Sequence, residues 1–298
     1  MHRDAQQPSD ELPLMLPSVA TPTPVQLPRR LRIGPWRFEV SQVDGGDPTE
    51  LPAAAEGGVL TAAGPLGSVT IRPYDSPPQA TAALLYPAWS ERACRVQGRN
   101  FYCDIDFEGP RLTWWWPRRY WQRSSPALWD MSVLASTQAL ALQRGGLLLH
   151  GAALVLDGQA VVVSGPSGAG KSTLAARFAG QVLHDDVIAL APDGHSPSGW
   201  AAWSQDGSRA PSGELPGQVP LQRLLLFSSD RSHTFCTPML TAEALGELAA
   251  QTYFAGGMAT ARLMAQLAEL AASVPLGRLG HCLSDSTATV QATLRGEG

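Results

Sequence analysis

One octapeptide of the chain has the residue types that a phosphate-binding loop needs. It satisfies the pattern G-x-x-x-x-G-K-[ST] and precedes Thr173; its members are Gly165, Pro166, Ser167, Gly168, Ala169, Gly170, Lys171 and Ser172. Glycines let backbone N–H groups turn inward around phosphate oxygens, because no Cβ stands in the way. Lys171 supplies a point charge for the β- and γ-phosphates, and the Ser172 hydroxyl can ligate Mg²⁺. The motif therefore predicts that this loop holds the phosphates of a nucleotide.

Two adjacent carboxylates, Asp185 and Asp186, interrupt the apolar segment Val182–Leu190. Burying them is costly unless a charged group meets them. Consecutive side chains of an extended strand point to opposite faces, so we expect one carboxylate to face a metal ion on the nucleotide and the other a different neighbour. Phosphoryl transfer needs such a division, because one group holds the metal and another accepts the proton of the attacking hydroxyl.

Three further polar residues are weaker candidates. A single histidine in an apolar strand, such as His150, is more often a core residue than a catalyst, so it counts only together with the two carboxylates. Arg209 and Arg223 are candidates for neutralising a transferred phosphate, although solvated surface arginines are more common. The Gly/Ser/Pro-rich stretch 193–217, which holds Trp200 and Trp203, is either a lid or substrate loop or a surface connection.

The elements that must position these residues can be predicted from their patterns. Leu147–Leu156 and Gln159–Ser164 are expected to form a hairpin around the turn Asp157-Gly158, and the second strand runs into the glycine-rich loop. A helix over Ser172–Ala179 should begin at the loop with its N-terminus toward the anion. Because a hairpin feeds the loop, the predicted fold is α/β with a mixed sheet.

The remaining elements suggest three regions: a disordered Pro-rich tail over residues 1–30, a small β-rich domain over 31–124 and a kinase domain over 125–298. The expected strands of the β-rich domain are Arg32–Val40, Ser68–Arg72, Ala83–Tyr86, Arg95–Cys103 and Leu112–Trp116. In the third region we expect a helix between Ser125-Pro126 and Gly145-Gly146, a buried strand Leu221–Phe227, and helices Thr241–Phe254 and Met258–Val274.

Composition excludes several classes of function. The chain has 298 residues, 44% of them hydrophobic, and a net charge of −4, which is typical of a globular protein. Its four cysteines lack the spacing of a zinc site, and no apolar run approaches the ~20 residues of a membrane span. Arg118-Arg119 beside Trp114, Trp115 and Trp116 is the nearest approach to a nucleic-acid patch. We therefore expect a cytoplasmic protein that binds neither nucleic acid nor membrane.

The spacing of these motifs resembles that of a known family. His150-Gly151, the loop that begins 15 residues later and Asp185-Asp186 together resemble HPr kinase/phosphorylase and its related serine kinases, and the layout is similar to the nucleotide core of phosphoenolpyruvate carboxykinase. The resemblance is clear over Leu147–Leu190. It implies a P-loop kinase core in which Gly165–Thr173 binds ATP, Asp185 holds Mg²⁺ and Asp186 is the base, with His150 beside it. Which aspartate has which role stays open.

The chain also departs from that family. It lacks the P-G-R-N segment of HPr kinase/phosphorylase, and Thr237-Pro238-Met239 is the nearest fragment. The match is better to related kinases, some of which phosphorylate a serine of a ribosomally made peptide. We therefore expect an ATP-dependent kinase for a serine hydroxyl of a protein or peptide, and a homo-oligomer is compatible with the sequence.

Other functions remain open on the sequence. A small-molecule kinase could use the same core. A decarboxylating carboxykinase would need a second lysine as metal ligand, but Lys171 is the only lysine of the chain. An ATPase or nucleotide switch ranks lower because no LSGGQ-type signature follows the loop. A scaffold without activity is disfavoured by the intact Lys171, Ser172, Asp185 and Asp186.

Overall fold

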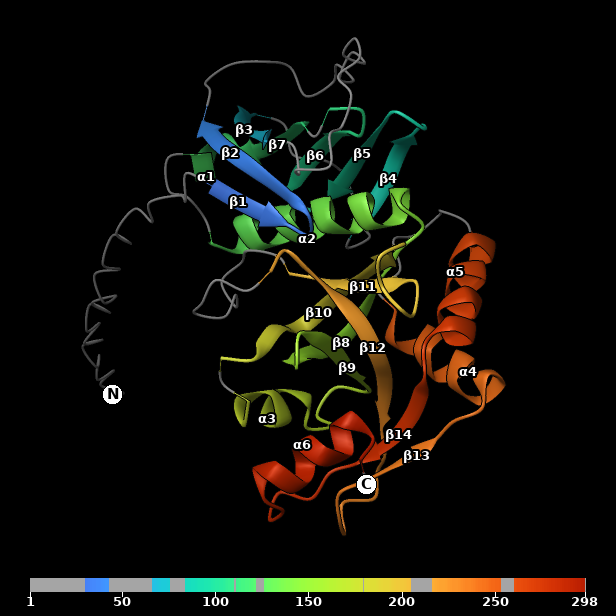
Figure 1. The fold of residues 1–298 in the computed structure, drawn as a ribbon. Coiled ribbons are helices and arrows are strands. Elements are labelled where there is room, and N and C mark those ends of the chain that lie inside the picture. Colours follow the sequence, from blue (N-terminus) through green and yellow to red (C-terminus); the bar gives the residue numbers. More distant parts are fainter. Residues whose placement is uncertain are drawn as a thin grey trace, which may run out of the picture.

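The computed structural model describes residues 30–42, 66–75, 84–109, 111–121, 126–178, 180–204, 216–252 and 260–297 (Figure 1). Residues 1–29 of the tail predicted over 1–30 and the candidate Arg209 lie outside these ranges, whereas Arg30 begins a strand. Within them the chain forms two seven-stranded sheets with helices, a mixed α/β arrangement. No helix of the described part is both long and apolar enough to span a membrane.

The first sheet has the strand order β1-β2-β3-β7-β6-β5-β4. Its strands are β1 (Arg30–Ile33), β2 (Trp36–Gln42), β3 (Leu66–Tyr74), β4 (Leu84–Trp89), β5 (Ala93–Gly98), β6 (Phe101–Asp106) and β7 (Arg111–Pro117). Two predicted single strands are in fact hairpins. The chain turns at Gly34-Pro35 between β1 and β2, and at Arg99-Asn100 between β5 and β6. Polar and turn-forming residues at the two bends explain both corrections.

The second sheet carries the predicted motifs. Its strands are β8 (Leu147–Leu156), β9 (Gln159–Ser164), β10 (Val182–Pro192), β11 (Trp200–Trp203), β12 (Gln218–Phe227), β13 (Phe235–Pro238) and β14 (Leu276–Gly280), in the order β11-β10-β8-β9-β12-β14-β13. β9, β12 and β14 are parallel, whereas β8 pairs antiparallel with β9 and β10. The predicted hairpin and the mixed sheet are therefore confirmed. β13 and β14 were not predicted.

Strand β11 corrects the interpretation of the stretch 193–217. It pairs with β10 on one side and with β12 on the other, so this end of the sheet closes on itself. Trp200 and Trp203 are 1% and 2% exposed, which makes them core residues of an ordered strand. Residues 205–215 of the stretch lie outside the described part. The part of this stretch over Trp200–Trp203 is thus a buried strand, and not a lid or a surface connection.

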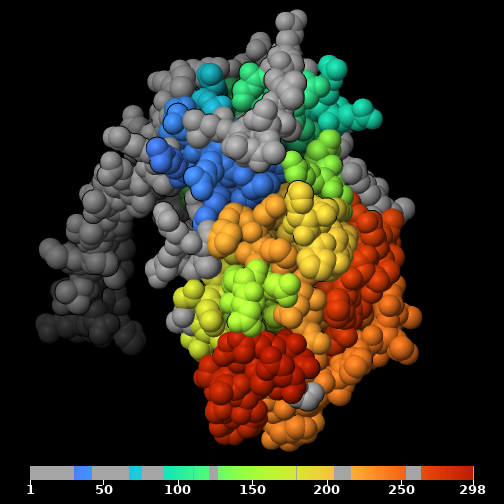
Figure 2. Space-filling model, viewed as in Figure 1, coloured from blue at the N-terminus to red at the C-terminus, as the bar shows by residue number. Residues whose placement is uncertain are grey.

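Six helices complete the described fold: α1 (Arg118–Trp121), α2 (Pro126–Gln143), α3 (Lys171–Ala176), α4 (Thr241–Gln251), α5 (Thr260–Ser273) and α6 (Thr287–Arg295). α3 is shorter than the predicted Ser172–Ala179 and begins one residue earlier, and α6 was not predicted. α2 lies between the two sheets, and α6 lies at the end of the molecule opposite the first sheet (Figures 1 and 2).

Alternation along β8 and β9 sends side chains into separate cores. One face of the second sheet, with Leu149 and Val162, packs on α4 and α5. The other face is covered in two places. Leu148 belongs to the core that α2 forms with the first sheet, whereas Ala152 and Leu154 pack with α3 and α6. His150, between Leu148 and Ala152 on β8, therefore lies at the boundary between the core that contains α2 and the core that contains α3 and α6.

The first sheet is joined to α2 by buried polar contacts. Indole N–H groups of Trp114 and Trp116 donate to Ser136 Oγ and Ser132 Oγ, each at 3.0 Å. Both rings are fully buried, so these tryptophans belong to the core. This core continues through α2 into the second sheet at Leu148. The helix that the sequence assigned to residues 125–298 thus packs on both sheets.

Candidate active site

The glycine-rich loop (Gly165–Ser172) connects β9 to α3, as its motif predicts. Gly168 and Gly170 have φ angles of 78° and 103°, which side-chain-bearing residues rarely adopt. Built Cβ atoms at these two positions would meet no neighbour, so the glycines are required by backbone conformation and not by crowding. The loop is therefore shaped by its backbone, as a cradle for an anion must be.

Lys171 is held inside this loop. Its ammonium group donates to the carbonyl oxygens of Gly165 at 2.8 Å and Pro166 at 2.9 Å, and the residue is 6% exposed. Burial lowers the pKa of Lys171, while the nearby Asp185 and Asp186 act in the opposite direction. The amine is thus held at the loop, and its hydrogen bonds to neutral carbonyls can be exchanged for bonds to an anion.

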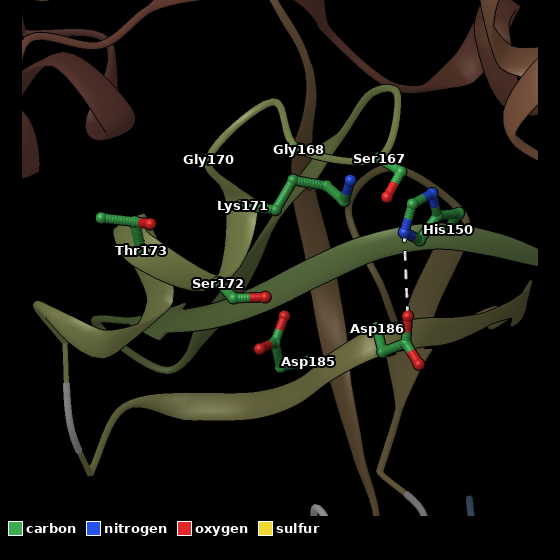
Figure 3. A pocket seen from close by; sticks show the side chains of 9 residues that line it. All are labelled: His150, Ser167, Gly168, Gly170, Lys171, Ser172, Thr173, Asp185 and Asp186. Atoms are coloured by element: carbon green, nitrogen blue, oxygen red, sulfur yellow. Dashed lines mark ion pairs between the residues drawn. The ribbon is translucent and has the colours of Figure 1, made fainter.

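Asp185 lies on β10, opposite Ala152 of β8. Its carboxylate and the hydroxyl of Ser172 point toward one another (Figure 3). Asp185 Oδ1 is buried and has no hydrogen-bond partner among the described residues. A buried carboxylate oxygen without a partner is costly, and a bound cation would remove that cost. This observation fits Mg²⁺ between Ser172 and Asp185.

Asp186 does not point to the opposite face, as an extended strand would require. Its φ angle is 96°, a conformation that is uncommon for residues other than glycine, although aspartate tolerates it better than most. Both carboxylates therefore line one pocket, which corrects the expected division between two faces. Backbone strain of this kind occurs most often where function requires a particular geometry.

His150 faces Asp186 across the β8–β10 pair. The distance from His150 Nε2 to Asp186 Oδ1 is 3.7 Å, which is an ion-pair distance when the ring is protonated and too long for a hydrogen bond (Figure 3). The backbone oxygen of His150 accepts a 2.7 Å hydrogen bond from Ser164 Oγ, the last residue of β9. The histidine is thereby tied to the strand that leads into the loop.

The candidate residues share one pocket of about 260 Å³. Its lining consists of His150, Ser167, Gly168, Gly170, Lys171, Ser172, Thr173, Asp185 and Asp186. Of the predicted site, Gly165, Pro166 and Ala169 belong to the loop without lining the pocket. Pockets for drug-sized ligands are about 300–1,000 Å³, so this one suits a phosphate chain with its metal better than a whole nucleotide.

The donor set also fits magnesium better than zinc. Among the described residues, no group of three or more His, Cys, Asp or Glu side chains is placed to hold a metal ion. Mg²⁺ is usually bound by one or two carboxylates, substrate phosphates and water, and does not need a complete protein cage. Ser172 and Asp185 are sufficient ligands of that kind.

Of the two arginine candidates, Arg209 lies outside the described residues and Arg223 does not line the pocket, whereas an unexpected arginine contacts the loop. Arg223 donates to the backbone oxygen of Leu294 at 3.3 Å, near the end of α6. Arg231 donates to the oxygens of Ala169 and Gly168. No motif marks Arg231 in the sequence. Only its place after a strand parallel to β9 could have identified it.

Comparisons with known proteins give a structural similarity without a match in sequence. No protein-family model matches the chain, and no curated protein matches it. Among solved structures, the Hpr(Ser) kinase/phosphatase from Coxiella burnetii is similar over 50% of this chain and 95% of its own, with 12% identity and a TM-score of 0.30. Similarity at this TM-score does not establish a shared fold.

Proposed function

We propose that the chain is an ATP-dependent kinase that transfers the γ-phosphate to a serine hydroxyl of a protein or peptide. The observation that supports this most strongly is the convergence of Lys171, Ser172, Asp185, Asp186 and His150 on one pocket. An ATPase or switch needs the loop and a metal ligand. A second carboxylate next to a histidine adds what a hydroxyl acceptor requires, a group that can take its proton.

Each side chain has a role in the proposed transfer. Lys171 and the loop N–H groups bind the β- and γ-phosphates. When bound, Mg²⁺ on Ser172 and Asp185 neutralises charge on the phosphate oxygens. Asp186 accepts the proton of the serine hydroxyl, and His150 orients and balances that carboxylate from 3.7 Å. Most of the rate enhancement then comes from positioning and charge neutralisation, since phosphoryl transfer needs little covalent help.

Titration calorimetry with ATP and radiolabel transfer test the two parts of this proposal. We expect ATP to bind with Mg²⁺, and the Asp185→Asn variant to lose the dependence on the metal. Label from the γ-phosphate should appear as phosphoserine on serine-containing peptides whose genes neighbour the gene of this chain. Release of inorganic phosphate without any labelled acceptor would favour the ATPase reading. Absence of ATP binding at millimolar concentration would exclude both.

A further inference from the structure

Arg231 contacts the glycine-rich loop but does not line the pocket that holds the two aspartates. β12 is the parallel neighbour of β9, and Leu226 is paired with Ser164. Because parallel strands end at the same edge of a sheet, the segment after Phe227 emerges beside Gly165. A Cβ built on Gly165 would lie 3.1 Å from Cβ of Phe227, which shows how closely the two strand ends approach.

The backbone on both sides of Arg231 is fixed by hydrogen bonds. Asp230 Oδ1 accepts from the N–H of Ser232 at 2.9 Å and from its hydroxyl at 2.8 Å. The N–H of Thr234 donates to Asp285 Oδ2 at 2.8 Å, which ties the segment to the residues before α6. Although Arg231 is exposed, its side chain therefore starts from an ordered backbone.

The guanidinium group contacts two carbonyls of the loop. Arg231 Nη2 donates to the oxygen of Ala169 at 3.0 Å and, more weakly, to that of Gly168 at 3.4 Å. In a trans peptide the C=O and N–H groups point in opposite directions. Holding the Ala169 oxygen toward Arg231, which does not line the pocket, thus directs the N–H of Gly170 to the opposite side, toward the pocket that Gly170 lines.

We propose that Arg231 is a positioning residue of the nucleotide site, which orients the Ala169–Gly170 peptide so that its N–H faces the phosphates. The inference rests on the proposed function, because the N–H needs a phosphate to bind. Gly170 has a φ angle of 103° and no side chain, so the Ala169–Gly170 peptide plane has few local restraints. An external donor on the Ala169 oxygen supplies one.

The role of hydrogen bonding can be separated from that of charge. Arg231→Gln keeps an N–H donor and removes the charge, whereas Arg231→Ala removes both. Arg223→Ala is the matched control, because Arg223 also donates to a backbone carbonyl but lies away from the pocket. Calorimetric titration with ATP and Mg²⁺ is done on each variant at low salt and at 0.5 M salt, where charge effects between exposed groups are screened.

We expect the Arg231→Ala variant to bind ATP with Mg²⁺ about five- to tenfold more weakly than the wild type at both salt concentrations. Arg231→Gln should stay within about twofold of the wild type, and so should Arg223→Ala. Wild-type affinity of Arg231→Ala would overturn the inference while leaving the proposed function intact. Equal weakening of the Ala and Gln variants, lost at 0.5 M salt, would also overturn it, because charge alone would then act. A wild-type chain that binds no ATP would overturn both.

Discussion

Asp104 in the first sheet and Asp185 in the second are both aspartates on strands of mixed sheets, but their surroundings differ. Both oxygens of Asp104 are used: Arg95 donates to them at 2.5 and 2.7 Å, and the indole of Trp115 adds a bond at 2.7 Å. Asp185 Oδ1 is buried without a partner. The first carboxylate completes a fold, whereas the second is left for something the chain itself does not provide.

This difference predicts opposite consequences of substitution in the two sheets. Satisfied buried polar groups stabilise the native state, so removing a partner lowers the free energy of unfolding. Unsatisfied or strained groups at a pocket reduce stability, so their removal affects activity while stability is kept or increased. The following variants test this contrast, from the largest expected effect to the smallest.

Asp186→Asn should lower the rate of phosphoryl transfer by about 10²- to 10⁴-fold, because the amide cannot accept the proton of the hydroxyl. Asparagine tolerates a positive φ as aspartate does, so the free energy of unfolding should not fall. Single-turnover transfer from radiolabelled ATP and chemical denaturation measure the two quantities. An undiminished rate would remove Asp186 from the proposed role.

Asp104→Asn should have the converse effect. Arg95 is 7% exposed, and the substitution removes the charged carboxylate that its buried guanidinium group pairs with. We expect the free energy of unfolding to fall by about 3 kcal/mol. The affinity of the folded fraction for ATP with Mg²⁺ should stay unchanged. Loss of nucleotide affinity without loss of stability would contradict the assignment of this pair to the fold.

Two serines provide a smaller and closely matched comparison. Ser136→Ala deprives the buried Trp114 indole of its acceptor and should lower the free energy of unfolding by about 1–3 kcal/mol. Ser172→Ala removes an exposed hydroxyl and should change stability by less than about 0.5 kcal/mol while weakening the response to Mg²⁺. Denaturation curves and Mg²⁺ titrations of both variants are sufficient. Equal stability losses would argue against the contrast.

The dependence on pH should reveal a buried histidine near the loop. His281 is 4% exposed; burial lowers its pKa, Arg177 and Arg231 act in the same direction, and Asp285 opposes them. Below about pH 6.5 the unfolded chain therefore binds a proton at His281 that the folded chain does not bind. The free energy of unfolding falls as the pH decreases. His281→Gln should reduce this slope, whereas exposed His195→Gln should not. Identical slopes would refute the assignment.

Much of the fold followed from local patterns. The hairpin of β8 and β9 was marked by apolar runs around Asp157-Gly158, and the loop by its glycines and Lys171. The turns at Gly34-Pro35 and Arg99-Asn100 were missed, because apolar residues on both sides of a short turn resemble one longer strand. β13 and β14 are short and lie at one end of the sheet, so their alternation is too brief to predict.

The sequence by itself determined which residues have the chemistry for binding a nucleotide: a glycine-rich loop with one lysine, two adjacent carboxylates and a histidine. Only the tertiary structure decided that they meet. It turned Asp186 into the pocket that Asp185 also lines, placed His150 between two cores, and brought Arg231 against Ala169. Residue types and spacing are local properties, whereas these placements arise from the pairing of β8, β10 and β12 across long stretches of chain.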